Sequence, residues 1–217
     1  EYRGIRCTFV HVNKEDPDNF AGIGALKDAD LLFLSVRRRT PPKAQLDLIR
    51  AHLAKGKPLV GIRTASHAFD REPPSQRHAR WTQFDDEILG VDYRQHYGNR
   101  PPKDPATVIQ ATVSGTKHPI LTGVTQDAFE AKSHLYKNKL VATTVTVLMT
   151  GTLSGQADIS EPVAWTNEVN GSRIFYTSLG GVGDFSLPAF QRLLLNGVLW
   201  ALDRPLPPAD PRVVARK

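Results

Sequence analysis

The sequence is poor in cysteine and in long apolar runs, and both absences narrow the classes to which it can belong. Its 217 residues include one cysteine, Cys7, which cannot form a disulfide within the chain. Cys7 lies in an apolar alternation, so we expect a core residue rather than a nucleophile. No apolar run approaches the roughly 20 residues that a transmembrane helix needs. The sequence therefore predicts no membrane partner.

Long runs of one charge are also absent. The formal net charge is +6 and the pI about 9.5, but the basic residues are scattered and the one basic run comprises the arginines at positions 37–39. We interpret this run as a solvated rim beside a strand end, with a phosphate contact as the alternative. The pattern predicts no nucleic-acid partner.

The composition is that of a globular protein, with 40% hydrophobic and 23% charged residues. A chain of this length can bury one full core, so we expect a single domain over residues 1–203. The four prolines after position 203 predict an extended C-terminal tail over residues 204–217. The first residue is Glu1, so removal of a leader is one expectation, which leaves the compartment open between cytoplasm and export.

The order of apolar segments predicts an α/β fold with a doubly wound, mostly parallel, flavodoxin-like sheet. An apolar segment at 30–36 has the pattern of a central strand covered on both faces. A helical repeat of Leu46, Ile49 and Leu53 then leads to a strand at 58–62, as in a parallel crossover. The other predicted elements are a final helix at 187–202 and strands at 5–11, 107–113, 140–150, 161–168 and 172–179.

The stretch at 57–69 organises the predicted site. The strand at 58–62 is followed by a polar patch that contains Arg63, Ser66 and His67. In α/β sheets, ligands bind at the carboxyl ends of the strands. The polar excursion at 70–105 is long for a compact domain, and loops of this length are often functional.

Several stretches of the chain resemble one family. They are LVGIRTASHAF (59–69), HPILTGV (118–124), the block at 161–202, and the segments at 78–99 and 133–137. Together they are similar to the ThuA-like (trehalose utilisation) family, in particular its planctomycete-type bacterial branch. The resemblance implies the class I glutamine amidotransferase-like fold and a loose link to carbohydrate metabolism.

Two positions depart from a working amidotransferase of that fold. The resemblance places Arg63 where the cysteine nucleophile would lie, and a guanidinium is only a donor. It also places Gly180 and Gly181 where a Gly-His pair would supply the base. We therefore expect no glutaminase activity. The direct step from Arg3 to Gly4 also departs from the family, and we hypothesise that a helix is missing between them.

The candidate catalytic groups are the histidines His67, His78 and His96, whose pKa lies near neutrality, and Asp184 after the glycine-rich turn. The candidate ligand-binding residues combine hydrogen-bonding groups, aromatic rings and close backbone approach. They are Arg63, Ser66, Trp81, Tyr97, Asn99, Gly180 and Gly181.

Alternative roles were weighed for several of these side chains. The spacing of the three histidines matches no tight metal motif, so the sequence predicts neither a metal nor a cofactor. The acidic residues 85–87 are interpreted as a solvated first helical turn rather than as glycosidase carboxylates. Tyr136, Lys137 and Glu161 are weaker candidates, and His118 and His134 are expected to be structural.

The leading hypothesis is a protein that binds or processes a small carbohydrate or sugar derivative at the carboxyl edge of its sheet. One alternative is a catalytically inert interaction module. Another is a hydrolase or transferase of unrecognised chemistry. The sequence does not decide whether the protein is an enzyme, and a homodimer is an open expectation.

Overall fold

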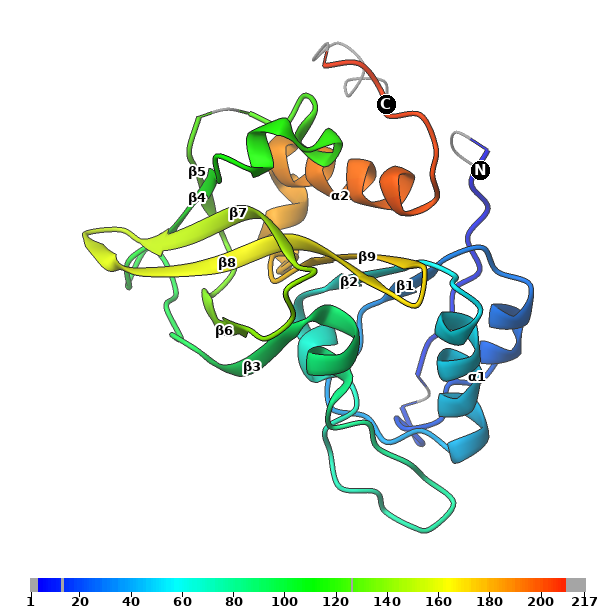
Figure 1. The fold of residues 1–217 in the computed structure, drawn as a ribbon. Coiled ribbons are helices and arrows are strands. Elements are labelled where there is room, and N and C mark those ends of the chain that lie inside the picture. Colours follow the sequence, from blue (N-terminus) through cyan, green and yellow to red (C-terminus); the bar gives the residue numbers. More distant parts are fainter. Residues whose placement is uncertain (1–3, 13, 126, 210–217) are drawn as a thin grey trace.

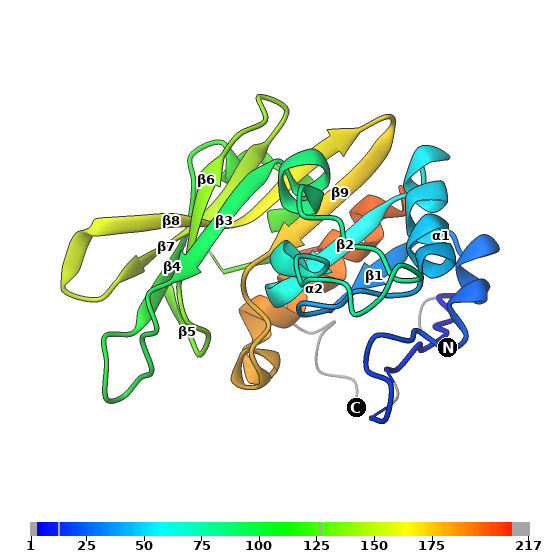
Figure 2. The ribbon, with the colours of Figure 1, turned by 90° about the horizontal axis from the view of Figure 1, so that it is seen from below.

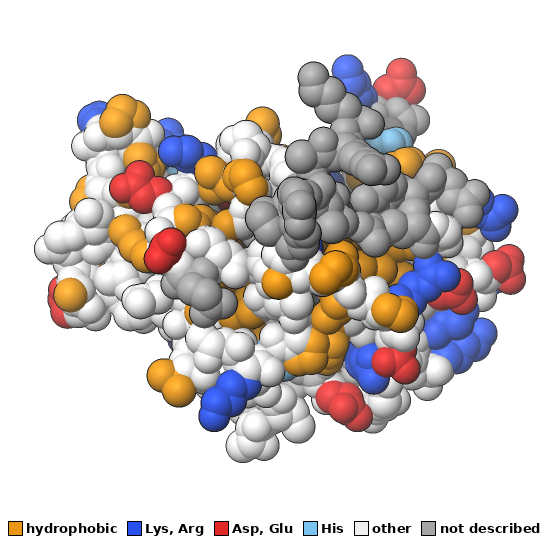
Figure 3. All heavy atoms as spheres, turned by 90° about the horizontal axis from the view of Figure 1, so that it is seen from above, with side chains coloured by type: hydrophobic (Ala, Val, Ile, Leu, Met, Phe, Trp, Pro, Cys, Tyr) orange, Lys and Arg blue, Asp and Glu red, His pale blue; other side chains and the backbone are white. Residues whose placement is uncertain are grey.

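The computed structural model describes residues 4–12, 14–125 and 127–209, and its centre is a seven-stranded sheet with helices on both faces (Figure 1). Helix α1 (Lys43–Ala54) lies on one face and helix α2 (Pro188–Ala201) on the other. Among the described residues, no helix is long and apolar enough to cross a membrane. On the face seen from above, basic and acidic side chains lie interspersed (Figure 3).

The sheet is mixed, and this corrects the predicted mostly parallel arrangement. Its order is β1-β2-β9-β8-β7-β4-β5. The parallel part is β1 (Leu32–Leu34), β2 (Leu59–Ile62) and β9 (Ser172–Thr177). The antiparallel part is β8 (Gln156–Val169), β7 (Thr146–Leu153), β4 (Thr107–Ala111) and β5 (Phe129–Ala131).

Tight turns explain the antiparallel half. Strands β8 and β9 are joined at Asn170 and Gly171, both of which adopt positive φ, and a two-residue turn of this kind returns the chain antiparallel to itself. Helix α1 connects the parallel pair β1 and β2, whereas β9 pairs in parallel with β2 from a distant part of the chain. The α/β class is thus confirmed, while the doubly wound, flavodoxin-like arrangement is not.

Strand β9 divides the interior into two cores because its side chains alternate between the faces. Ile174 and Tyr176 pack with α1 in one core, and Phe175 packs with α2 in the other. A Cβ atom on Gly197 of α2 would lie 2.2 Å from the Phe175 ring. Glycine at this position therefore lets the helix approach the sheet closely.

A second, two-stranded ribbon lies on the same side of the main sheet as α1 (Figures 1 and 2). It pairs β3 (Val91–His96) with β6 (Tyr136–Leu140) in antiparallel register. His96 lies opposite Tyr136, and the register shifts between Tyr93 and Gln95. The polar excursion expected at 70–105 thus contains a strand.

Short helices complete the described structure. The π-helix η3 (Asp85–Leu89) precedes β3. The 3-10 helices are η1 (Ile23–Lys27), η2 (Arg63–His67), η4 (Gly115–Lys117), η5 (Pro119–Leu121) and η6 (Val182–Ser186).

Two predictions for the first part of the chain were wrong. Residues 6–12 form no strand, and Cys7 is exposed rather than buried, because apolar alternation makes a strand only where a neighbouring strand pairs with it. Strand β1 lies at an edge of the described sheet, and Phe33 is 43% exposed, so it is not a central strand. The hypothesis of a missing helix after Arg3 and the tail at 210–217 lie outside the described residues.

Candidate functional site

Arg63 lies at a sharp turn from strand to helix. It follows β2, begins η2 and has a φ of 50°, a left-handed conformation that is uncommon for arginine. The buried hydroxyl of Tyr176 donates to its carbonyl oxygen. A turn of this kind presents the nucleophile in many hydrolases, and here it presents a guanidinium group.

The guanidinium of Arg63 lies beside an aromatic cluster built from three segments of the chain. Its Cζ atom is 5.1 Å from the centroid of the Tyr136 ring, within cation–π range. The rings of Tyr136 and Tyr93 are 5.0 Å apart, and His67 stacks on Tyr93 at 4.3 Å. The ribbon of β3 and β6 therefore brings two tyrosines to the carboxyl ends of the parallel strands.

Two further histidines extend the cluster. The ring of His96 is 6.3 Å from that of Tyr136 and 5.1 Å from that of His134. His96 is exposed at the end of β3, and His134 is half-buried just before β6. The aromatic cluster thus comprises His67, Tyr93, His96, His134 and Tyr136.

The electrostatic field around the cluster is positive. Burial, followed by the charges of Arg38, Arg37 and Arg63, lowers the pKa of His67 to about 3. Burial and then Arg63 also lower the pKa of His96. Both imidazoles are neutral near pH 7, so they can donate or accept hydrogen bonds but carry no charge there.

The imidazole of His67 is held by its neighbour Ser66. The Oγ of Ser66 lies 3.1 Å from Nδ1 of His67 and donates to the carbonyl oxygen of Arg63 at 3.4 Å. Ser66 is only 2% exposed, so it orients the imidazole rather than contacting a ligand.

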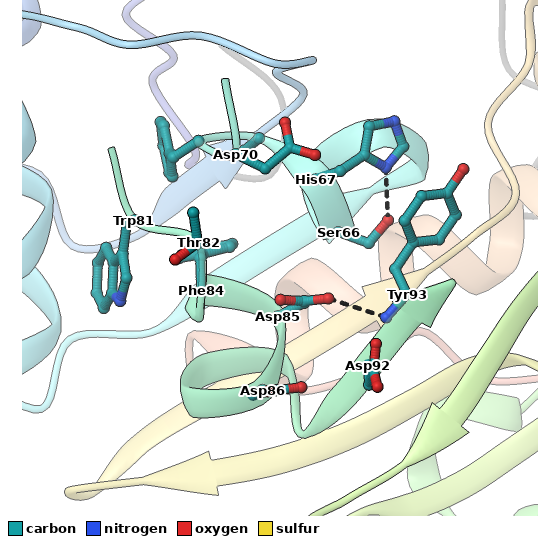
Figure 4. Close-up of a pocket in the computed structure, with 12 residues that line it drawn as sticks. Ser66, His67, Asp70, Trp81, Thr82, Phe84, Asp85, Asp86, Asp92 and Tyr93 are labelled. Atoms are coloured by element: carbon teal, nitrogen blue, oxygen red, sulfur yellow. Dashed lines mark hydrogen bonds between the residues drawn. The ribbon is translucent and has the colours of Figure 1, made fainter. Parts of the chain in front are cut away.

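An acidic pocket of about 210 Å³ adjoins His67 and Tyr93 (Figure 4). Within the described part of the chain, the carboxylates of Asp85, Asp86 and Asp92 form one group, with ligand atoms within 4.8 Å of one another. Burial raises the pKa of Asp85 to about 6, and the N–H of Tyr93, which donates to it at 2.9 Å, opposes the rise.

The acidic turn at η3 is therefore only partly solvated. Asp86 is exposed, as expected for a solvated first turn, but Asp85 is half-buried and faces the pocket. The predicted candidates His67, His78 and His96 form no metal-ligating group in the described residues.

Asp184 has a structural environment. It is fully buried, and its carboxylate accepts the backbone N–H groups of Gly180, Gly181 and Lys132 at 2.8, 3.0 and 2.6 Å. The hydroxyl of Ser133 also donates to it. The amides of both glycines thus bind Asp184 and not an external ligand, so we do not include these three residues in the site.

His78 and Trp81 lie apart from the aromatic cluster in their contacts. His78 is on a loop, where its Nδ1 pairs with Ser75 at 2.9 Å. Trp81 is 7% exposed, donates from Nε1 to Glu87 and is covered by Arg50 at 4.0 Å. Its ring lines the far part of the acidic pocket but offers no open face to a sugar (Figure 4).

Tyr97 and Asn99 also make structural contacts. The Tyr97 hydroxyl donates to Glu161 at 2.8 Å, and Lys137 lies 4.4 Å from its ring centroid. Asn99 is 4% exposed, and its amide bridges the backbone of Pro105 and Leu135. Of the predicted candidates, the structure brings Arg63, Ser66, His67 and His96 together.

Sequence reasoning missed several residues of the cluster. Tyr136 was considered a weak candidate, His134 was expected to be structural, and Tyr93 was not singled out. The charges of Arg37 and Arg38, interpreted as a rim, reach the site because both follow β1, which is parallel to β2. That shared strand direction was the available signal.

Comparisons with known proteins agree with this architecture. A sequence profile of the ThuA family, described as trehalose utilisation, matches residues 4–201. ThuA-like proteins from Bacteroides uniformis and Parabacteroides merdae are similar in structure, with TM-scores of 0.60 and 0.59 and identities of 18% and 19%. In both cases the match covers 82% of this chain and 71% of the other.

A part of a larger enzyme shows the same fold. Gan42B, a GH42 beta-galactosidase from G. stearothermophilus, matches with a TM-score of 0.52 and 18% identity. The match covers 83% of this chain and 23% of that one. No curated protein sequence matches this chain.

Proposed function

The chain belongs to the ThuA family, and from that premise we propose that it binds a small carbohydrate or sugar derivative at the carboxyl edge of β2 and β9. The ligand would lie against the half-buried ring of Tyr93, which the buried rings of Tyr136 and His67 support, with Arg63 and His96 as hydrogen-bonding groups. We propose no glutaminase activity, because a guanidinium occupies the turn that would present a nucleophile.

One observation carries this proposal: Arg63 and His67 of η2, Tyr93 of β3 and Tyr136 of β6 converge around the stacked pair of His67 and Tyr93. Sugar rings require apolar faces beside hydrogen-bonding groups, and tyrosine supplies both. The imidazole of His67 is neutral near pH 7 and stacks on Tyr93 without adding a charge. The geometry therefore suits a polyhydroxylated ring better than a purely apolar molecule.

Thermal unfolding with a panel of neutral and derivatised sugars, trehalose among them, tests the proposal. A ligand at a hundred times its Kd adds about 2.7 kcal/mol of stability, which corresponds to an increase in Tm of roughly 5 to 10 °C for a chain of this size. We expect one sugar class to give such a shift.

Variants then locate the site. The shift should disappear in Arg63→Ala and in Tyr93→Leu, and it should persist in Arg77→Ala, which removes an exposed arginine from a loop. If no sugar changes the Tm of a cooperatively unfolding protein, the proposal fails and the interaction module becomes the better hypothesis. Incubation with glutamine should release no ammonia.

A further inference from the structure

We propose that the ligand of this site carries an oxyanion, a carboxylate or a phosphate, and that the guanidinium groups of Arg37 and Arg63 bind it. This inference rests on the proposed function, because it assigns a charge to the same ligand. It is carried by two guanidinium groups near the aromatic cluster that form no salt bridge in the described part of the chain.

Neither guanidinium has an ionic partner within the described part of the chain. Arg37 and Arg63 form no salt bridge there. The hydrogen bond of Arg63 is a long one, 3.4 Å from Nη1 to the carbonyl oxygen of Ser178. Arg63 is half-buried, and a partly desolvated charge is costly unless an opposite charge lies beside it.

The carboxylates near the cluster already have other contacts. Asp70 lies 3.9 Å from Arg38, Asp85 accepts the backbone N–H of Tyr93, and Asp92 pairs with Arg94. Arg38, the second arginine of the run, therefore has a counter-charge, whereas Arg37 and Arg63 form no salt bridge in the described residues. A bound oxyanion would supply the missing negative charge, and guanidinium groups bind carboxylate and phosphate with paired hydrogen bonds.

The two guanidinium charges act on the same rings. Arg37 and Arg63 both influence the titration of His67, Tyr93, His96 and Tyr136. Burial raises the pKa of both tyrosines, so their hydroxyls stay protonated and can donate. An oxyanion at this place would meet two cations and several neutral donors.

Backbone strain points to the same place. Arg63 and Arg38 have φ angles of 50° and 49°, and they follow adjacent parallel strands, β2 and β1. Such conformations cost free energy and gather at ligand-binding sites. Here they occur at two arginines, Arg38 and Arg63, that follow these strands at the carboxyl edge of the sheet.

Isothermal titration calorimetry with glucose, glucuronate, glucose 6-phosphate and inorganic phosphate tests the inference. We expect at least one of the two charged sugars to bind at least tenfold more tightly than glucose, and the tighter of the two identifies the oxyanion. Raising the salt from 25 to 500 mM should weaken its binding, because the attraction is screened.

Matched variants assign the residues. Arg63→Gln and Arg37→Gln should each weaken the charged sugar about tenfold and leave any glucose binding nearly unchanged, whereas Arg77→Gln should change neither. Arg37 is exposed, so its replacement keeps the fold, which circular dichroism can verify.

The outcomes separate the two proposals. Equal affinity for glucose and both charged sugars would overturn the oxyanion and leave the carbohydrate site standing. Binding of inorganic phosphate without any sugar would support the oxyanion and contradict the carbohydrate ligand. Binding of none of the four compounds would contradict both.

Discussion

Two turns at the carboxyl edge of the sheet each carry a charged side chain, and only one of these charges is compensated by groups of the protein. At the turn after β9, the carboxylate of Asp184 is buried and receives four donors from its surroundings. At the turn after β2, the guanidinium of Arg63 is half-buried and has no carboxylate partner in the described residues. The charge at the first turn is fully hydrogen-bonded within the protein, and the charge at the second has no carboxylate partner in the described residues. This difference separates a structural charge from a charge available to a ligand.

Replacing Asp184 should have the largest effect on stability. Asp184→Ala leaves four buried donors without an acceptor, so we expect a loss of about 3 to 5 kcal/mol in the free energy of unfolding. Urea denaturation measures it, with the exposed Asp30→Asn as control. A loss below about 1 kcal/mol would show that the turn after β9 does not depend on this carboxylate.

Acid should destabilise the protein through His67. The pKa of His67 is about 3 in the fold and near its ordinary value of 6.5 in the unfolded chain, so the unfolded state binds the proton first as the pH falls. Stability is therefore lost from about pH 6.5 down to about pH 3. Between pH 7 and pH 4.5 this group should account for roughly 2 to 3 kcal/mol. In His67→Gln the pH dependence of the free energy of unfolding should be flatter by that amount; parallel pH profiles would disprove the assignment.

Asp85 offers the opposite of Asp184, a buried carboxylate with little compensation. Its pKa of about 6 lies above the ordinary value of 3.8, so the fold favours the protonated form and loses stability as the pH rises from 3.8 to 6. Asp85→Asn should therefore stabilise the protein by about 1 kcal/mol at pH 7, after discounting for solvent screening, and not at pH 3.5. The asparagine Oδ1 can still accept the N–H of Tyr93. Chemical denaturation at the two pH values measures this, and destabilisation at pH 7 would contradict it.

The smallest expected effect is a gain in stability at Arg63. Glycine adopts positive φ without a steric cost, so Arg63→Gly should relieve the strain of the left-handed conformation and raise the free energy of unfolding by up to about 1 kcal/mol. The same variant should lose ligand binding. Calorimetric unfolding without ligand, compared with the binding titration, shows whether stability and binding move in opposite directions at this turn.

The sequence located site residues where they come directly after a strand in the chain. The apolar run of β2 with the polar patch after it located Arg63, Ser66 and His67. The partners of these residues could not be located in the same way, because Tyr136 reaches the site through pairing of β6 with β3, about 40 residues away along the chain. Patterning along one segment does not specify which distant segment pairs with it.

The role of Asp184 could not be predicted from its local sequence either. Its position after a glycine-rich turn suggested a catalytic carboxylate, but the donors that occupy it include Lys132 and Ser133, which lie 52 and 51 positions away. The parallel pair of β1 and β2 was predictable from its helical connection, whereas the other pairs are long-range, such as β2 with β9 and β7 with β4.

The register shift in β3 controls which side of the ribbon its rings occupy. Tyr93 and His96 are three positions apart, and in a regular strand an odd separation places two side chains on opposite faces. The irregularity between Tyr93 and Gln95 changes that parity, so both rings lie near Tyr136. The site thus depends on this bulge as well as on the identity of the residues. Pairing β3 in regular register with Arg94 retained would turn either Tyr93 or His96 away, with every ring of the cluster still present in the chain.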